Sequence, residues 1–224
     1  MLNPSLTKPI QEETLKLKKY AAIDIGSNAM RLLITYIVEQ EGKESQFNKN
    51  SLVRVPIRLG QDSFTVGEIS EENIDRMIDA MKAFRLLMKV HKVEKYKALA
   101  TSAMREAYNG KEVVEIIKEK SGIDIEIIDG KKEAIIIAST DLNHMLKSDK
   151  TYLYVDVGGG STEFSLFDNG KIVVSKSFKA GTVRFLNKMV CDVVWEEMEK
   201  WIKTNTKEYD EVILIGSGGN INKL

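Results

Sequence analysis

The chain has 224 residues, in which 33 lysines and arginines balance 33 aspartates and glutamates, with two histidines and one cysteine. The zero net charge argues against a general nucleic-acid binder. One cysteine and two histidines cannot form an internal disulfide or an ordinary structural zinc site. The apolar runs are far shorter than the roughly 18 residues of a membrane span, and the N-terminal residues contain no apolar signal segment. The sequence therefore predicts a soluble cytoplasmic protein without a membrane or nucleic-acid partner.

The first structured elements follow a polar segment, residues 1–19, which we expect to be a tail. Apolar runs at Tyr20–Ile25 and Met30–Val38 flank Gly26-Ser27-Asn28 and predict a hairpin. Residues 39–50 are turn-rich, and Leu52–Leu59 alternates like a strand, with Pro56 indicating a sheet edge. Further elements are then predicted in order: a helix from its N-cap Ser70 to Val90, a strand at 97–100, a short helix after Thr101, a helix at 111–120, a strand at 123–128 and a helix at 131–146.

After a polar break at residues 146–150 the pattern begins again. We expect strands at 152–157, 162–167 and 171–178, with Asn169-Gly170 as a hairpin turn, then helices near Leu186 and Glu197, a strand at 212–215 and a loop at 216–220. Strands that alternate with helices favour an α/β fold. The predicted division is a tail at 1–19, one domain at 20–146 and a second at 147–224.

A short pattern occurs twice in the chain, offset by 132 residues. Ile23-Asp24-Ile25-Gly26 and Val155-Asp156-Val157-Gly158 both place an aspartate at the end of an apolar strand, before a glycine turn and a returning strand. We interpret this as two related halves that face each other across a cleft.

The repeated turns have the chemistry of a phosphate and metal site. Glycines let backbone N–H groups approach a phosphate closely, and Mg²⁺ prefers carboxylates together with phosphate oxygens. The alternative for each turn is a tight hairpin in which the aspartate is only a turn residue. The run Gly158–Gly160 is followed by a predicted strand and lacks the spacing of a dinucleotide-binding fingerprint, which argues against a Rossmann site.

Five segments in order resemble the exopolyphosphatase / guanosine pentaphosphate phosphohydrolase (Ppx/GppA) family, within the actin–Hsp70–sugar kinase superfamily. They are Asp24-Ile-Gly-Ser-Asn-Ala-Met-Arg31, Ala100-Thr-Ser-Ala-Met-Arg-Glu-Ala107, Gly130-Lys-Lys-Glu-Ala134, Asp156-Val-Gly-Gly-Gly-Ser-Thr-Glu163 and Gly216-Ser-Gly-Gly219. The resemblance implies two ribonuclease-H-like (actin-like) domains around a cleft. Because the family pattern continues past residue 224, we expect the second domain to be incomplete in this chain.

The resemblance also implies a function, the Mg²⁺-assisted release of terminal phosphate from inorganic polyphosphate or guanosine pentaphosphate, and a homodimer as an assembly. It assigns site residues as follows: Glu133 as catalytic base and Glu163 as a second acid near the water; Ser27, Asn28 and Arg31 in the first phosphate loop; Arg105 as a further phosphate contact; Gly158, Gly159, Gly160, Ser161 and Thr162 in the second loop; Gly218 and Gly219 in a third; Asp156 and Asp24 as the magnesium carboxylates.

Simpler interpretations remain open for these residues. Glu133 falls early in a predicted helix, where a glutamate interacts favourably with the helix dipole, and Glu163 fits a solvated strand position. Arg31 and Arg105 fit surface ion pairs. Two other functions are also open, an ATP-dependent kinase of the same superfamily and a sensor that binds polyphosphate or alarmones without hydrolysis. The sequence does not distinguish polyphosphate from guanosine pentaphosphate.

Overall fold

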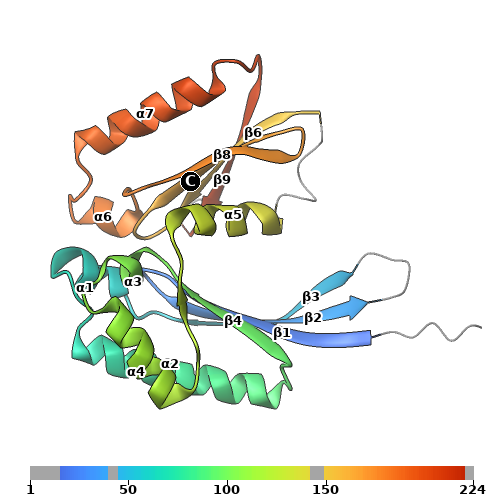
Figure 1. Ribbon diagram of the computed structural model, residues 1–224, viewed down its shortest axis with the longest axis vertical. Helices are drawn as coiled ribbons and strands as arrows, with labels where there is room; N and C mark the ends of the chain where they lie inside the picture. Colours follow the sequence, from blue (N-terminus) through green and yellow to red (C-terminus); the bar gives the residue numbers. More distant parts are fainter. Residues whose placement is uncertain (1–15, 40–44, 142–148, 220–224) are drawn as a thin grey trace, which may run out of the picture.

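The computed structural model describes residues 16–39, 45–141 and 149–219. In these ranges the chain forms two β-sheets with helices packed on them (Figure 1), which confirms the mixed α/β prediction. The first sheet has five strands in the order β3-β2-β1-β4-β5, and the second has four in the order β8-β7-β6-β9.

The first half builds its sheet from a three-stranded antiparallel meander and two parallel strands. Its strands are β1 (Lys16–Ile25), β2 (Met30–Glu39), β3 (Gln46–Val55), β4 (Lys95–Ala100) and β5 (Glu126–Ile127), and its helices are α1 (Leu59–Thr65), α2 (Glu71–Val90), α3 (Ser102–Glu106) and α4 (Gly110–Ser121). As predicted, Ser70 caps α2, where its side chain accepts a hydrogen bond from the Asn73 backbone N–H.

One face of the first sheet carries the main hydrophobic core. Alternate residues of β1 and β2 are buried there, and the apolar side of α2 packs against them; the core includes Ala21, Ile23, Ile25, Met30, Leu32, Ile34, Met77, Met81 and Phe84. The opposite face carries Asp24 and Arg31. Because strand side chains alternate between faces, the core fixes which residues point to the other side.

The second half repeats the arrangement of the first. Its elements are β6 (Thr151–Val157), β7 (Thr162–Asp168), β8 (Lys171–Phe178), α6 (Thr182–Leu186), α7 (Asp192–Thr206) and β9 (Val212–Gly218). β6, β7 and β8 form an antiparallel meander and β9 pairs with β6 in parallel, as β4 pairs with β1. The two sheets thus share a topology, in agreement with the internal repeat of the sequence.

Helix α5 (Gly130–Asp141) connects the halves and lies between the two sheets in Figure 1. It packs against β7 and β8 of the second sheet. The predicted division after residue 146 assigns this helix to the first half by sequence, whereas its contacts place it on the second sheet. On the other side of the molecule, α1 and α6 meet across the two halves.

Several predicted boundaries differ from the structure. Residues 16–19, expected in the tail, extend β1 because they pair with the far end of β2. The third strand spans Gln46–Val55 rather than residues 52–59, and residues 59–65 form α1 instead. β5 is shorter than predicted, and Gly216–Gly218, expected in a loop, continue β9. Residues 1–15, residues 142–146 of the predicted helix and Asn220 lie outside the described residues.

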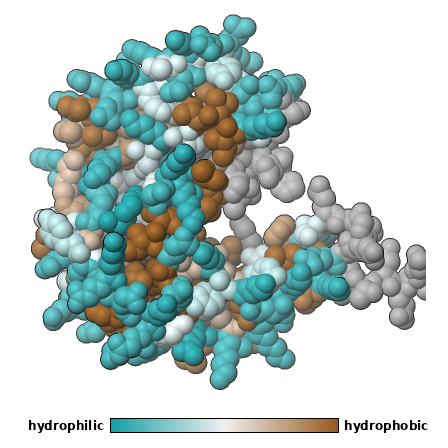
Figure 2. All heavy atoms as spheres, viewed as in Figure 1, coloured by the Kyte–Doolittle hydropathy of each residue, from teal (hydrophilic) through white to brown (hydrophobic). Residues whose placement is uncertain are grey.

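The face of the molecule in Figure 2 is mainly hydrophilic, with apolar residues gathered in separate patches. Among the residues that the structure describes, no helix combines the length and the apolar character that crossing a membrane requires.

Candidate functional site

The two repeated turns lie at equivalent ends of the two sheets. In the first turn, between β1 and β2, the Gly26 N–H donates to the Ala29 carbonyl at 3.1 Å. In the second, between β6 and β7, the Gly158 N–H donates to the Ser161 carbonyl at 2.9 Å. Both turns therefore share the hydrogen bond from the glycine N–H to the carbonyl three residues later, and both join the two strands of a hairpin, as the sequence pattern predicted.

The two turns are in direct contact. A Cβ atom at Gly160 would lie 2.4 Å from both the Phe64 ring and the Ser102 Oγ, and one at Gly159 would lie 3.1 Å from the Ser27 Cβ. The Ser27 and Ser102 hydroxyls are 2.9 Å apart and hydrogen-bonded. Glycine is thus required at position 160 because the first half approaches the second turn too closely for any side chain.

Arg184 of α6 links the second turn to the first half through two hydrogen bonds. Its Nε donates to the Gly160 carbonyl at 2.7 Å, and its Nη2 donates to the Glu106 carboxylate of α3 at 2.7 Å. The guanidinium lies over the Phe64 ring, 3.8 Å from the ring centre, and Arg184 is only 7% exposed. Lys179 adds an outer ion pair to Glu106 at 3.2 Å. A buried arginine with such contacts fixes the relative position of the two turns.

The predicted catalytic glutamate lies beside a predicted phosphate-binding arginine. Glu133, in the first turn of α5, has its carboxylate 3.4 Å from the Arg105 guanidinium of α3. Arg105 also donates to the Ile128 carbonyl at 2.6 Å, which fixes its direction. The Glu133 side chain is 14% exposed and the Arg105 side chain is 25% exposed. This contact between α3 and α5 brings the second and third motifs of the sequence together.

Glu163, on β7, lies next to this pair and is almost fully buried, with 2% exposure. The Ser177 hydroxyl of β8 donates to its carboxylate at 2.8 Å. Ser177 also packs under the start of α5, since a Cβ at Gly130 would lie 2.6 Å from the Ser177 Cβ. The glycine at position 130 therefore allows α5 to approach β8 and places Glu133 near Glu163.

Burial and mutual repulsion change the acidity of these carboxyls. Burial, together with the nearby Glu163 and Asp24, raises the pKa of Glu133 to about 8, although Arg105 opposes the shift. Burial also raises the pKa of Glu163, although hydrogen bonds from Ser161 and Ser177 offset part of this effect. Two buried carboxyls that repel each other bind protons more tightly than free glutamates.

Asp24 and Asp156 face the same region from the two halves. The Arg31 guanidinium is 3.5 Å from the Asp24 carboxylate. Partial burial raises the pKa of Asp24, Arg31 lowers it, and Asp156 raises it again. Within the described parts of the chain, no three histidine, cysteine or acidic side chains are arranged to hold a metal by themselves. Two carboxylates do fit Mg²⁺, which keeps several waters and phosphate oxygens as its other ligands.

The structure gathers most of the predicted site residues at this junction. Ser27 is buried against the second turn and Asn28 is exposed. Gly218, at the end of β9, pairs with Val157 beside Gly158 and has φ +113, and a Cβ there would lie 2.3 Å from the Val157 carbonyl oxygen. Among the described residues, no atom outside its chain neighbours lies within 4 Å of a Cβ placed at Gly219. Thr162 is turned inward, and its hydroxyl donates to the Ala180 carbonyl.

Sequence reasoning missed four side chains that shape the site. They are Ser102, Glu106, Ser177 and Arg184. Ser102 and Glu106 fall inside the motif at residues 100–107, which offered a signal. Ser177 and Arg184 had none, because only the folded chain brings β8 and α6 to the turns.

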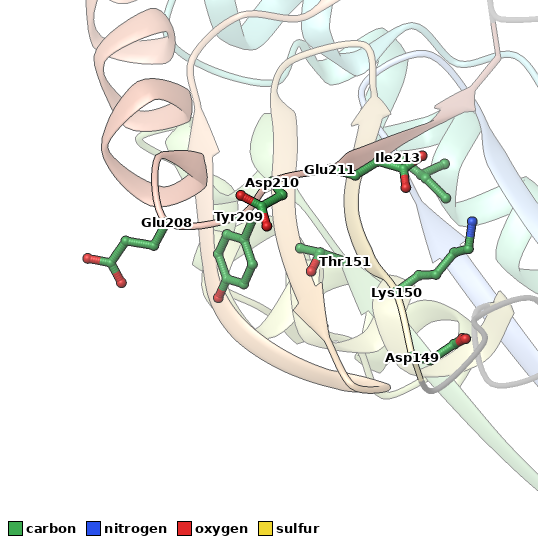
Figure 3. Close-up of a pocket in the computed structure, with 8 residues that line it drawn as sticks. All are labelled: Asp149, Lys150, Thr151, Glu208, Tyr209, Asp210, Glu211 and Ile213. Carbon is green, nitrogen blue, oxygen red and sulfur yellow. The ribbon is translucent and has the colours of Figure 1, made fainter.

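A shallow pocket of about 330 Å³ lies elsewhere, at the opposite end of the second sheet, where β6 and β9 begin (Figure 3). Its lining includes four acidic side chains, those of Asp149, Glu208, Asp210 and Glu211, and the single basic one of Lys150. Such a lining repels phosphate, so this pocket is not a candidate for the predicted substrate.

Comparison with known proteins relates the chain to one phosphatase family. The model of the Ppx/GppA phosphatase family matches residues 38–213. The chain is 32% identical over 203 residues to a bifunctional 3-dehydroquinate synthase/phosphatase of Fusobacterium nucleatum, covering 85% of this chain and 30% of that protein. It is 29% identical over 175 residues to exopolyphosphatase 2 of Mycobacterium tuberculosis, covering 76% of this chain and 54% of that protein. The chain thus spans 30% of the length of the first relative and 54% of the length of the second.

Solved structures share the two-domain actin-like fold. The crystal structure of an exopolyphosphatase from Cytophaga hutchinsonii aligns with a TM-score of 0.74 and 26% identity, covering 92% of this chain and 68% of that one. The similarity confirms the predicted fold class.

The contact between the turns predicts a cost for any side chain at position 160. Gly160→Ala should lower the free energy of unfolding by about 1–3 kcal/mol, because the new methyl group overlaps the Phe64 ring and the Ser102 hydroxyl. Urea denaturation measures the change. Gly219→Ala is the matched control, since no atom of the described residues outside its chain neighbours lies within 4 Å of its Cβ position. Equal stability of the two variants would contradict the close contact.

The Arg184 contacts predict a coupling between the halves. Arg184→Met should destabilise the protein by about 2–3 kcal/mol, because a buried charged hydrogen-bond donor is lost. A double-mutant cycle with Glu106→Gln should give a clear coupling energy by thermal or urea unfolding. Lys179→Gln, which removes only the outer ion pair, should cost less than about 1 kcal/mol. Additive effects of the Arg184 and Glu106 substitutions would contradict a stabilising interaction between these two side chains.

Proposed function

Because the chain belongs to the Ppx/GppA phosphatase family, we propose that it takes part in hydrolysis of the terminal phosphoanhydride bond of inorganic polyphosphate or guanosine pentaphosphate. The observation that carries this proposal is the buried pair Glu133 and Glu163 beside Arg105, at the junction of two glycine turns. This arrangement offers a proton acceptor next to a cation that suits phosphate.

Glu133 is the proposed general base. A base acts best when its pKa lies near the working pH, and burial raises the pKa of Glu133 to about 8. In its ionised form Glu133 accepts a proton from the attacking water, while Arg105 holds the carboxylate in direction. Glu163, oriented by Ser177, is the proposed second acid, which fixes the position of that water by hydrogen bonding.

Arg31, Arg105 and the backbone N–H groups of the two turns are the proposed phosphate ligands. Phosphoryl transfer requires neutralisation of charge on the transferred group and on the leaving phosphate. Guanidinium groups meet phosphate oxygens through two hydrogen bonds. Two further sets of residues belong to this proposal. The turns contribute Ser27, Asn28, Gly158, Gly159, Gly160, Ser161 and Thr162, and the adjacent end of β9 contributes Gly218 and Gly219.

Asp24 and Asp156 would hold Mg²⁺ between the halves. Burial and the repulsion by Asp156 raise the pKa of Asp24, and a divalent cation would relieve that repulsion. When bound, the ion would neutralise charge on the phosphate oxygens. We also propose a cytoplasmic location, on the composition of the sequence, and self-association into a homodimer, which the family resemblance implies.

The choice between substrates is open to one assay. Phosphate release is measured side by side from long-chain polyphosphate and from guanosine pentaphosphate, with and without Mg²⁺. The names of the relatives, two of which are exopolyphosphatases, favour polyphosphate. Release from neither substrate, with tight binding of one of them, would instead support a sensor; phosphate transfer to an acceptor other than water would support a kinase.

Glu133→Gln should reduce phosphate release by about 10²–10⁴-fold, because the amide cannot accept the proton from water. The amide keeps the size of the side chain, so the unfolding temperature should not fall. Turnover near that of the original protein would remove Glu133 as the base. Glu119→Gln, an exposed substitution on α4, is a matched control that should leave the rate unchanged.

The raised pKa of Glu133 predicts a pH dependence. The value of kcat/KM should rise with pH until about 8 and then level off, because the ionised form is the base.

The free energy of unfolding should change with pH in the opposite direction. The folded state binds this proton more tightly than the unfolded chain, so the free energy of unfolding should decrease as pH rises from about 4.5 through about 8. Both trends should be weaker in Glu133→Gln, and an unchanged pH profile in that variant would contradict the assignment.

A further inference from the structure

A row of charged residues crosses the first sheet beside its glycine turn. Asp24 on β1 is paired with Arg31 on β2, and Arg31 is paired with Arg54 on β3. Residues directly opposite each other on antiparallel strands project from the same face and are close neighbours. The 3.5 Å contact between Arg31 and Asp24 agrees with this geometry. Arg54 therefore extends the predicted phosphate site toward the edge strand, on the face opposite the hydrophobic core.

The second sheet has an equivalent row, in which the residues of the second and third strands form a hydrogen bond. Asp156 on β6 is paired with Glu163 on β7, and Glu163 with Ser177 on β8. Here the side chains of the second and third strands touch, with 2.8 Å between the Ser177 hydroxyl and the Glu163 carboxylate. Because the topology is repeated, the third position of the row is next to the site in both halves. In the first half that position is Arg54.

Arg58 is held against the first turn in an unusual backbone conformation. Its φ of 64° and ψ of 40° lie in the left-handed region, which is costly for a residue with a side chain. The Arg58 N–H donates to the Asn28 carbonyl at 2.9 Å, and two residues later the Gly60 N–H donates to the Ser27 carbonyl at 2.7 Å. Ile57 and Leu59 are buried on either side, so the exposed Arg58 is fixed at the turn.

The pairing of Arg31 with Arg54 and the left-handed backbone of Arg58 both lower the stability of the protein without a ligand. Two arginines directly opposite each other on neighbouring strands repel, and no described carboxylate forms an ion pair with Arg54 or Arg58. Local features that cost stability gather at functional sites, where a ligand compensates for them. An anion between these arginines would relieve the repulsion.

We propose that Arg31, Arg54 and Arg58 form a subsite for the phosphate groups that follow the terminal phosphate of a linear phosphoanhydride chain. This rests on the proposed function, since Arg31 joins the subsite to the site of cleavage. The backbones of the three arginines lie at one turn, on β2, near the end of β3 and just after β3. Guanidinium groups suit the successive phosphates of an extended polyanion. A ligand with only two phosphates would not reach past Arg31.

The test compares long-chain inorganic polyphosphate with pyrophosphate. Arg54→Gln and Arg58→Gln should each weaken the binding of the long chain by about tenfold, the loss of one charge-assisted contact, and leave pyrophosphate binding unchanged. The slope of log Kd against log salt concentration should become shallower by about one for each arginine removed. In the hydrolysis assay the KM for the long chain should rise while kcat stays constant. Lys89→Gln, on the exposed side of α2, is the matched charge control.

Arg58→Gly separates binding from folding. Glycine accepts the left-handed conformation without strain, so this variant should unfold at a higher temperature than the original protein and still bind the long chain about tenfold more weakly. Arg58 variants that bind polyphosphate normally would overturn its part in the subsite, and an unchanged Kd and KM in both single variants would overturn the proposal.

Kd is measured by titration, without turnover, so the two proposals fail separately. A weakened Kd in a protein that releases no phosphate would support the subsite and contradict hydrolysis. Normal release with an unchanged Kd in the arginine variants would support hydrolysis and overturn the subsite. No binding of polyphosphate by the original protein would overturn the subsite as well.

Discussion

The contact between the two glycine turns is the constraint on which the rest of the site depends. Gly160 has the Phe64 ring and two serine hydroxyls of the first half within 2.8 Å of the position that its Cβ would occupy. Arg184 of α6 donates a hydrogen bond to the Gly160 carbonyl. With the turns in contact, the strand ends that carry the aspartates are brought face to face. The glycines of this family motif thus have a packing function here in addition to any approach to phosphate.

The closed junction also sets the electrostatics of the site. Asp24, Glu133, Asp156 and Glu163 lie around two arginines, and burial and repulsion raise the pKa of three of these carboxyls. The fully ionised form of four carboxyls in such partly buried surroundings is unfavourable. It becomes favourable when a divalent cation is bound or when a proton is taken up. The same arrangement therefore supports both parts of the proposed chemistry, a cation between the aspartates and a proton acceptor at Glu133.

Much of this site could be predicted because its signals are local. The repeated Asp-Ile/Val-Gly pattern identified both turns, and the strands around them followed from alternation of apolar residues. Glu133 and Arg105 became candidates through the family resemblance, since a glutamate early in a helix carries no such signal of its own. The strand β3 was misplaced because its first six residues, Gln46 to Ser51, are polar except for Phe47, and pairing with β2 overrides the weak local preference. Arg184 and Ser177 could not be predicted, because their function depends on contacts between distant segments.

The repeated topology explains how one scaffold supplies two different kinds of chemistry. Each half ends its first strand with an aspartate, at Asp24 and at Asp156, and pairs it with a residue of the returning strand. That partner is Arg31 in the first half and Glu163 in the second. The third position of the row differs in the same sense, with Arg54 in the first sheet and Ser177 in the second. The first half thus presents positive charge that suits phosphate, and the second presents a carboxylate with its hydrogen-bond donor. Because the turns hold the two rows at one junction, a phosphate bound by the first half would meet the acids of the second.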